Sequence, residues 1–130
     1  TRSFATKGCS DEQKSIYNIV LEAQTKSIEG IKAGALCKDI DSIARDHITK
    51  SGYGKYFDHG LGHSLGLEIH ENPRFSKVSK DTLEVNYVMT VEPGIYVKEV
   101  GGVRIEDDVI VKESGAEILN KTSKELQIIS

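Results

Sequence analysis

The sequence predicts an α+β domain in which two helices pack on one face of a mainly antiparallel sheet. The first part of the chain carries two sets of apolar residues at three- and four-residue steps, which is the pattern of amphipathic helices. After residue 54 the chain becomes rich in valine, isoleucine and tyrosine, interrupted by glycine-containing turns, and this favours strands. Helices followed by strands in this order are typical of the α+β class.

A short strand is expected at the start, in TRSFATKG, and a helix follows it. Ser10 and Gln13 have the spacing of a capping box, and two acidic residues lie between them, where the helix dipole favours negative charge. The predicted inward stripe of this helix is Ile16, Tyr17, Val20, Ala23, Ser27, Ile28 and Ile31. Gly34 lies near its expected end.

A second helix is predicted before the strands begin. Its inward positions are Ile40, Ile43, Ala44, His47 and Ile48. Gly52, shortly after Lys50, is expected to close it. We interpret His47 as a partly buried or surface histidine rather than a ligand.

The segment YVMTVEPGIYVKEVGGVRIEDDVIVKESGAEIL is predicted to form three short strands, arranged as a meander or a pair of hairpins. Turns are expected at Pro93-Gly94, Gly101-Gly102 and Ser114-Gly115.

Composition narrows the class of protein. The 130 residues are enough for one domain, and 38% hydrophobic with 28% charged residues is typical of a globular chain. A net charge of −3 gives no reason to expect nucleic-acid binding, and no apolar run approaches the roughly 20 residues that span a membrane. Cys9 and Cys37 are too few for a disulfide framework, so a reducing, cytoplasmic setting is expected.

The segment HGLGHSLGLEIHE, residues 59–71, holds three of the four histidines. His59 and His63 have the spacing of a helical metal pair, but the two glycines between them disfavour a helix. In an extended segment His63 and His70 lie on opposite sides unless a bulge or turn intervenes, and Gly66 could supply one. A single histidine here would suggest a structural role, whereas three on a glycine-rich segment favour a functional site.

Two glutamates lie within apolar strand patterns: Glu92 in MTVEPGIYV and Glu106 in GGVRIEDDVIV. A carboxylate on such a strand is costly unless it is paired or bound to metal. Simpler interpretations are an ion pair between Glu106 and Arg104, and a strand-end position for Glu92. Asp107 and Asp108 are interpreted as solvent-exposed charges.

One histidine with these two glutamates forms a mixed nitrogen and oxygen ligand set, which suits manganese, cobalt, iron or zinc. An HExxH helix is excluded because Gly60 follows His59. GHSLG fits the G-x-S-x-G pattern around Ser64, but LEIHENP does not begin a helix as a nucleophile elbow requires.

The motifs HGLGHSLGLEIHENP, TVEPGIYV and GGVRIEDDVIV, in this order and spacing, resemble the metal-dependent Xaa-Pro peptidases of family M24, which include aminopeptidase P and prolidase. The resemblance covers essentially the whole chain, and VEPGIY and VRIEDD are closer to these enzymes than to methionine aminopeptidase. It implies part of a pita-bread fold, a curved antiparallel sheet with helices on one face. It also implies hydrolysis of peptide bonds at Xaa-Pro.

The resemblance further implies two divalent metal ions, Mn²⁺, Co²⁺ or Zn²⁺. The implied metal ligands are His63, Glu92 and Glu106. Glu106 would bridge the ions, and Glu92 would also accept a proton from the attacking water. His70 would donate to the scissile carbonyl, His59 would line the substrate pocket, and Arg104 would orient the carboxylates beside the substrate.

In the family the metal centre has two further aspartate ligands, the second of them two positions before the segment matched by residues 1–4. We therefore expect residues 1–130 to be the C-terminal portion of a catalytic domain, without the N-terminal domain and the first catalytic strands. The metal centre is expected to be incomplete or empty, and the chain inactive or nearly so alone. An exposed sheet edge would favour a homodimer.

Two other functions stay open. One is a binding module that keeps the pita-bread fold without metal, although retention of the motif residues argues against it. The other is a creatinase-type C–N hydrolase, which an assay of peptide against amidine substrates would separate from a peptidase.

Overall fold

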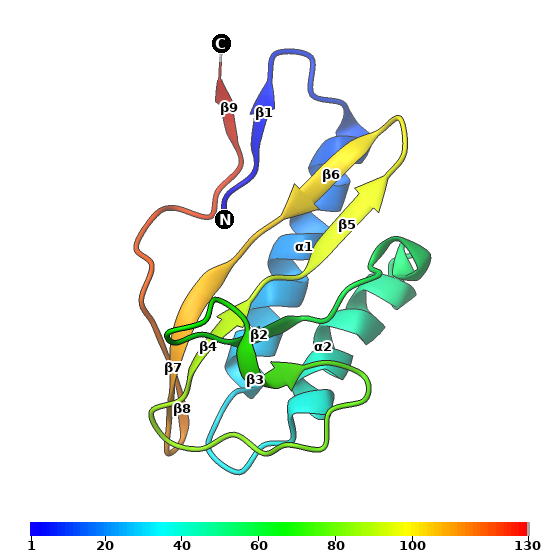
Figure 1. Ribbon diagram of the computed structural model, residues 1–130. Coiled ribbons are helices and arrows are strands. Elements are labelled where there is room, and N and C mark those ends of the chain that lie inside the picture. Colours follow the sequence, from blue (N-terminus) through cyan, green and yellow to red (C-terminus); the bar gives the residue numbers. More distant parts are fainter. Residues whose placement is uncertain (130) are drawn as a thin grey trace.

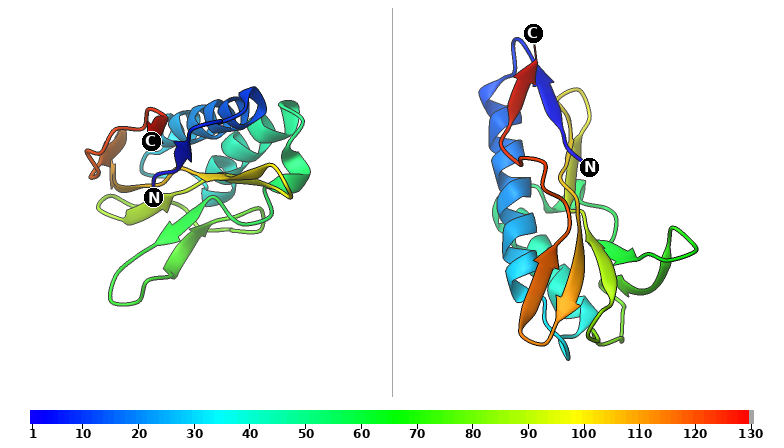
Figure 2. Two further views of the ribbon diagram at one scale, coloured as in Figure 1. Left: turned by 90° about the horizontal axis from the view of Figure 1, so that it is seen from above. Right: turned by 90° about the vertical axis from the view of Figure 1, so that its left-hand side faces the viewer.

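Two helices, α1 (Asp11–Gly30) and α2 (Cys37–Lys50), lie side by side on one face of a sheet in the computed structural model, which describes residues 1–129 (Figures 1 and 2). The predicted fold class is therefore confirmed. Among the described residues, no helix is both long and apolar enough to cross a membrane.

The first helix begins as its sequence predicts. The Gln13 amide donates to the Ser10 hydroxyl, and the Ser10 amide donates to the Gln13 side chain, so both halves of the capping box are present. The helix ends at Gly30, earlier than Gly34. A Cβ at Gly30 would lie 2.5 Å from the Ile43 Cδ1 atom, so the absence of a side chain lets α1 approach α2 closely.

The strands of residues 1–129 form three sheets. Their bounds are β1 (Phe4–Thr6), β2 (Gly62–Ser64), β3 (Glu71–Phe75), β4 (Val88–Val91), β5 (Gly94–Val97), β6 (Gly101–Arg104), β7 (Asp107–Lys112), β8 (Gly115–Ile118) and β9 (Gln127–Ile129), and a short 3₁₀ helix spans Gly54–Tyr56. The largest sheet has the order β3-β2-β4-β7-β8 and is antiparallel. β5 pairs with β6, and β1 pairs in parallel with β9 at the end of the molecule where both termini lie (Figure 1).

The segment predicted as three strands contains five, β4 to β8, because the ladder is interrupted at residues 92–93 and 105–106. The turn expected at Pro93-Gly94 is wrong. Val91 pairs with Asp107 and Gly94 pairs with Arg104, so β4 and β5 face β7 and β6 in one continuous register. The chain stays extended through Pro93, which has no N–H to donate, and the hydrogen-bond ladder is interrupted there instead.

The other two predicted turns have different outcomes. The true hairpin turn lies at residues 98–100, before Gly101-Gly102, which begin β6. The turn expected at Ser114-Gly115 lies one residue earlier, at Glu113-Ser114, between β7 and β8.

Alternation along this long hairpin separates two faces. One face packs in the hydrophobic core with both helices, and its buried apolar members are Met89, Val91, Ile95, Ile105, Val109 and Val111. The opposite face carries polar residues around the interruption: Thr90, Glu92, Arg104, Glu106 and Asp108. The sheet therefore presents a concentrated set of ionisable groups on the side away from the helices.

Candidate metal and substrate site

His63 and Glu92 meet across neighbouring strands of the large sheet. The Nε2 atom of His63, in β2, lies 3.2 Å from the Oε1 atom of Glu92, the residue after β4. The Nδ1 atom of His63 lies 2.9 Å from the Ser64 carbonyl oxygen, which fixes the ring. In the tautomer that donates through Nδ1, the Nε2 atom presents its lone pair toward Glu92.

Local backbone packing produces this approach. The Glu92 amide donates to the Leu61 carbonyl at 2.8 Å, and the His63 amide donates to the Thr90 hydroxyl at 3.0 Å. The Thr90 hydroxyl in turn donates to Glu92 Oε1 at 2.9 Å. A Cβ at Gly62 would lie only 2.0 Å from the Thr90 carbonyl oxygen, so only glycine permits β2 and β4 to come this close.

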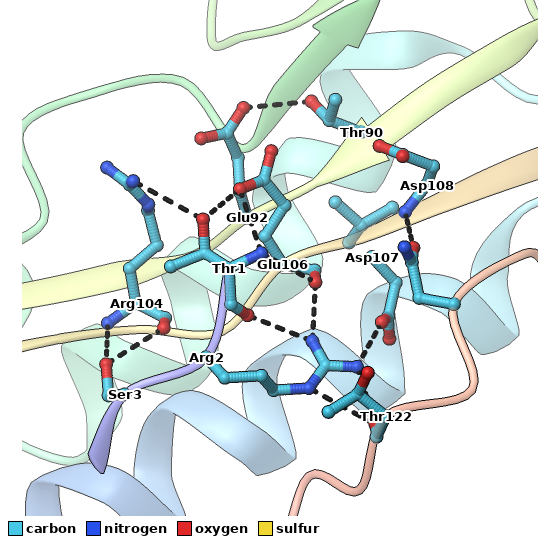
Figure 3. A network of polar contacts seen from close by, with 12 residues as sticks. Thr1, Arg2, Ser3, Thr90, Glu92, Arg104, Glu106, Asp107, Asp108 and Thr122 are labelled. Carbon is cyan, nitrogen blue, oxygen red and sulfur yellow. Dashed lines mark hydrogen bonds and ion pairs between the residues drawn. The ribbon is translucent and has the colours of Figure 1, made fainter.

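Glu106 lies opposite Glu92 in the continuous register, at the point where the ladder is interrupted. Its amide donates to the Thr1 carbonyl at 3.1 Å, and its carboxylate accepts from the Thr1 hydroxyl (Figure 3). Burial alone would raise the pKa of Glu106. The hydrogen bond from the Thr1 hydroxyl and the positive charges of the Thr1 amino group and Arg104 hold that pKa below its usual value. Glu106 is therefore favoured as a carboxylate.

The ion pair between Glu106 and Arg104, the simpler interpretation of Glu106, is not formed. The Arg104 guanidinium donates to the Thr1 hydroxyl at 3.4 Å, so the two side chains meet through Thr1 rather than directly (Figure 3). Their positions in the hairpin place them on one face, as the sequence predicted.

A cavity of about 290 Å³ adjoins the His63–Glu92 pair. Its ionisable lining is His59, His63, His70, Arg74, Glu92 and Arg104. Glu106 does not line it. The cavity thus joins the predicted substrate residues to two of the three predicted metal ligands.

His59 and His70 also line the cavity, and they differ in their contacts and exposure. His59 lies with Nδ1 2.8 Å from the Gly60 carbonyl oxygen and Nε2 3.0 Å from the Tyr96 hydroxyl. Burial raises the pKa of Tyr96, which keeps its hydroxyl protonated. His70 is exposed, with its ring centroid 4.4 Å from that of His63.

A turn intervenes between His63 and His70, as expected: the chain reverses in residues 65–70, which contain Gly66 and connect the antiparallel strands β2 and β3. A bulge also lies between His63 and Ser64. It shifts the pairing with β3, in which His63 faces Arg74. Sequence analysis did not select Arg74, although its place between the buried residues Pro73 and Phe75 indicates an outward side chain.

Asp107 was predicted to be an exposed charge, and this is wrong. Its side chain is completely buried and accepts hydrogen bonds from Arg2 at 2.6 Å and Gln24 at 2.9 Å, with Lys124 Nζ 3.0 Å away. Burial opposes ionisation, but these three donors lower the pKa of Asp107 below its usual value. The signal was available, because Asp107 has the same parity as the buried Val109 on one strand.

Asp108, His47 and Ser64 lie outside the cavity. Asp108 is half-buried on the face of Glu106, and burial with repulsion from Glu106 raises its pKa. His47 is partly buried, as predicted, and its Nε2 atom lies 3.2 Å from the Glu22 carboxylate of α1. Ser64 lies in β2 and donates to the Val88 carbonyl, so it is not on a nucleophile elbow.

The described part of the chain does not assemble a complete metal site. Among residues 1–129, no three histidine, cysteine, aspartate or glutamate side chains gather closely enough to hold a metal ion. His63 and Glu92 are in contact, whereas Glu106 is occupied by Thr1. The ligand types fit a divalent cation, and their number falls short of a closed site.

Known proteins resemble this chain over nearly its whole length. The model of metallopeptidase family M24 matches residues 1–113. The chain is 48% identical to the Xaa-Pro dipeptidase of Pyrococcus horikoshii and 50% identical to that of Pyrococcus furiosus, over 97% of this chain and 36% of each relative. It therefore spans about a third of the length of these relatives.

Solved structures of an Xaa-Pro dipeptidase and a prolidase superpose closely on this chain. The Xaa-Pro dipeptidase from Bacillus anthracis superposes with a TM-score of 0.96 at 52% identity, covering 98% of this chain and 36% of that one. The prolidase from Pyrococcus horikoshii superposes with a TM-score of 0.94 at 48% identity, covering 96% and 36%. These superpositions confirm the α+β, partial pita-bread arrangement expected from the motifs.

Proposed function

This chain belongs to metallopeptidase family M24, and we propose that its His63–Glu92 cavity serves the metal-dependent hydrolysis of peptide bonds at Xaa-Pro. The observation that carries the proposal is the 3.2 Å contact between His63 Nε2 and Glu92 Oε1 at the wall of a cavity lined by basic residues. Relatives named Xaa-Pro dipeptidase, at about half identity, support the choice of bond.

We propose His63, Glu92 and Glu106 as the residues of this chain that would hold divalent metal. A bound metal pair supplies a hydroxide nucleophile near neutral pH and polarises the scissile carbonyl. His63 is prepared for ligation because Nδ1 contacts a backbone carbonyl, the usual support of a metal-bound imidazole. A set of one nitrogen and two carboxylates suits Mn²⁺, Co²⁺ or Zn²⁺.

The side chains around the cavity would bind and orient the peptide. Glu92 keeps its Oε2 atom without a protein partner in residues 1–129, so it can accept a proton from the attacking water. His70 is exposed beside His63 and would donate to the scissile carbonyl, while His59 would line the pocket. Arg74 and Arg104 make the cavity positive, which suits the carboxylate of a short Xaa-Pro peptide.

We further propose that residues 1–130 are the C-terminal portion of a catalytic domain and nearly inactive alone. The chain spans about a third of its relatives, and residues 1–129 supply no complete metal site. Thr1 contacts Glu106, so residues joined to Thr1 in a longer chain would reach the same polar face.

A calorimetric titration of Mn²⁺ into the 130-residue chain tests the metal site. We expect one weak site that Glu92→Gln and Glu106→Gln both weaken, and that the exposed control Glu113→Gln leaves unchanged. An Xaa-Pro dipeptide assay of the same samples should show little or no hydrolysis. Binding that is insensitive to both substitutions would refute the assignment.

A metal-free binding module is the second candidate, favoured by the absence of a three-ligand cluster in residues 1–129. Under that function the chain would bind no Mn²⁺ but would still bind an Xaa-Pro dipeptide. A comparison of peptide and amidine substrates would reveal a creatinase-type hydrolase.

We also propose self-association as a homodimer in a reducing, cytoplasmic setting. Three apolar side chains on the β1–β9 pair are each more than half exposed: Phe4, Ile128 and Ile129. Burial of these side chains against a second copy of the chain would favour a dimer. Cys9 and Cys37 are free thiols. Light scattering across a dilution series tests the dimer.

A further inference from the structure

The side chain of Thr90 connects the two contacting residues of the cavity. We propose that Thr90 is a positioning residue, which holds Glu92 against His63 so that both can bind one cation. This inference rests on the proposed function for the cation and on geometry alone for the positioning.

The hydrogen bond from the His63 amide to the Thr90 side chain takes the place of a backbone hydrogen bond between β2 and β4. β2 and β4 share one paired position, Ser64 with Met89, within the described part of the sheet. At the next residues the His63 amide donates to the Thr90 hydroxyl at 3.0 Å instead of to a backbone carbonyl. Backbone hydrogen bonds from Leu65 to Val88 and from Glu92 to Leu61 flank this position, and at His63 itself the contact with β4 is made through a side chain.

The direction of each hydrogen bond follows from the donors. A backbone N–H can only donate, so the Thr90 oxygen must accept from His63. The hydroxyl keeps its own proton and donates it to Glu92 Oε1 at 2.9 Å. The same oxygen atom of Glu92 lies 3.2 Å from His63 Nε2, so one hydroxyl orients the carboxylate toward the imidazole.

Thr90 is suited to this role because it is nearly inaccessible, with 4% of its surface exposed. Water cannot easily replace its hydroxyl. The Thr90 carbonyl also lies against Gly62, so the residue is fixed on its backbone side as well. Removing the hydroxyl alone would free the Glu92 side chain to rotate without opening the core.

Matched variants separate the hydroxyl from the rest of the residue. Thr90→Val keeps the shape and removes the hydroxyl, whereas Thr90→Ser keeps the hydroxyl and removes a methyl group. Thr25→Val is the control, because the Thr25 hydroxyl donates at 2.9 Å to the Leu21 carbonyl on the exposed side of α1. Urea unfolding of each variant verifies that it is folded.

The first measurement is the ¹⁵N chemical shift of His63 Nε2, recorded by NMR at one pH without metal. Glu92→Gln removes the carboxylate that faces His63, so this variant shows in which direction the signal moves when the His63–Glu92 pair is altered. We expect Thr90→Val to move the His63 signal in the same direction as Glu92→Gln, and Thr90→Ser and Thr25→Val to leave it in place. An unmoved signal in folded Thr90→Val would overturn the positioning role.

The second measurement is Mn²⁺ affinity by calorimetry. Loss of an outer hydrogen-bond partner of a metal ligand typically lowers affinity by about 10- to 100-fold, and we expect this for Thr90→Val, with recovery in Thr90→Ser. Equal losses in both variants would assign Thr90 a packing role only. If the unchanged chain binds no Mn²⁺, the proposed metal site fails, and the His63 signal alone decides whether Thr90 positions Glu92.

Discussion

Replacing Asp107 by asparagine should strongly destabilise the fold. The carboxylate is fully buried and accepts from Arg2 and Gln24, with Lys124 also in contact. Asparagine has one acceptor oxygen, and its NH₂ group would face one of these donors. Removing one partner from a buried ion pair costs about 3–5 kcal/mol, and because Lys124 is 25% exposed we expect the lower end, about 3 kcal/mol.

That loss is a large part of the roughly 5–15 kcal/mol by which domains are stable. It corresponds to a fall in Tm of about 10 °C or more for a chain of this size. Urea unfolding at neutral pH measures it. The matched control is Asp108→Asn, since the raised pKa of Asp108 means that its charge is disfavoured in the fold, and its removal should be neutral or slightly stabilising.

The pH dependence gives an independent check. The folded pKa of Asp107 is below its unfolded value, so its contribution to stability is present above the unfolded pKa and is lost as the pH falls through the folded pKa. Asp107→Asn should therefore flatten the acid limb of the stability curve. Equal unfolding free energies for Asp107→Asn and Asp108→Asn at neutral pH would refute the reasoning.

Three further outcomes are expected. Gly62→Ala should cost about 2 kcal/mol or more by urea unfolding, because its Cβ would meet the Thr90 carbonyl oxygen at 2.0 Å, and wild-type stability would contradict that contact. Ser10→Ala should cost about 1 kcal/mol through loss of the capping box, and an unchanged Tm would count against it. Burial raises the pKa of Cys37 to about 11, so iodoacetamide should modify Cys9 first at neutral pH, and mass spectrometry showing the reverse order would exclude a buried Cys37.

Local signals in the sequence predicted the first strand and both helices correctly. The capping box at Ser10 specifies the start of α1 because its two hydrogen bonds involve residues only three positions apart. Alternation places Glu92, Arg104 and Glu106 on one face because side chains on a strand alternate regardless of which strand is the partner.

Other features depended on partners distant in the chain. Pro93-Gly94 has turn composition, yet it lies in a continuous hairpin because the strands on either side, β4 and β5, pair with β7 and β6 in one register. Arg74 enters the cavity only because β3 pairs with β2 in a register set by a bulge.

The sequence by itself determined the two helices, the polar face of the hairpin and the family motifs, since these follow from short-range spacing and residue type. The tertiary structure alone decided which distant donors satisfy the buried Asp107 carboxylate and that Thr90 links His63 to Glu92. Both depend on segments that are far apart in sequence and are brought together only by packing of the sheet against the helices. Hydrogen bonds of that kind have no local pattern from which they could be predicted.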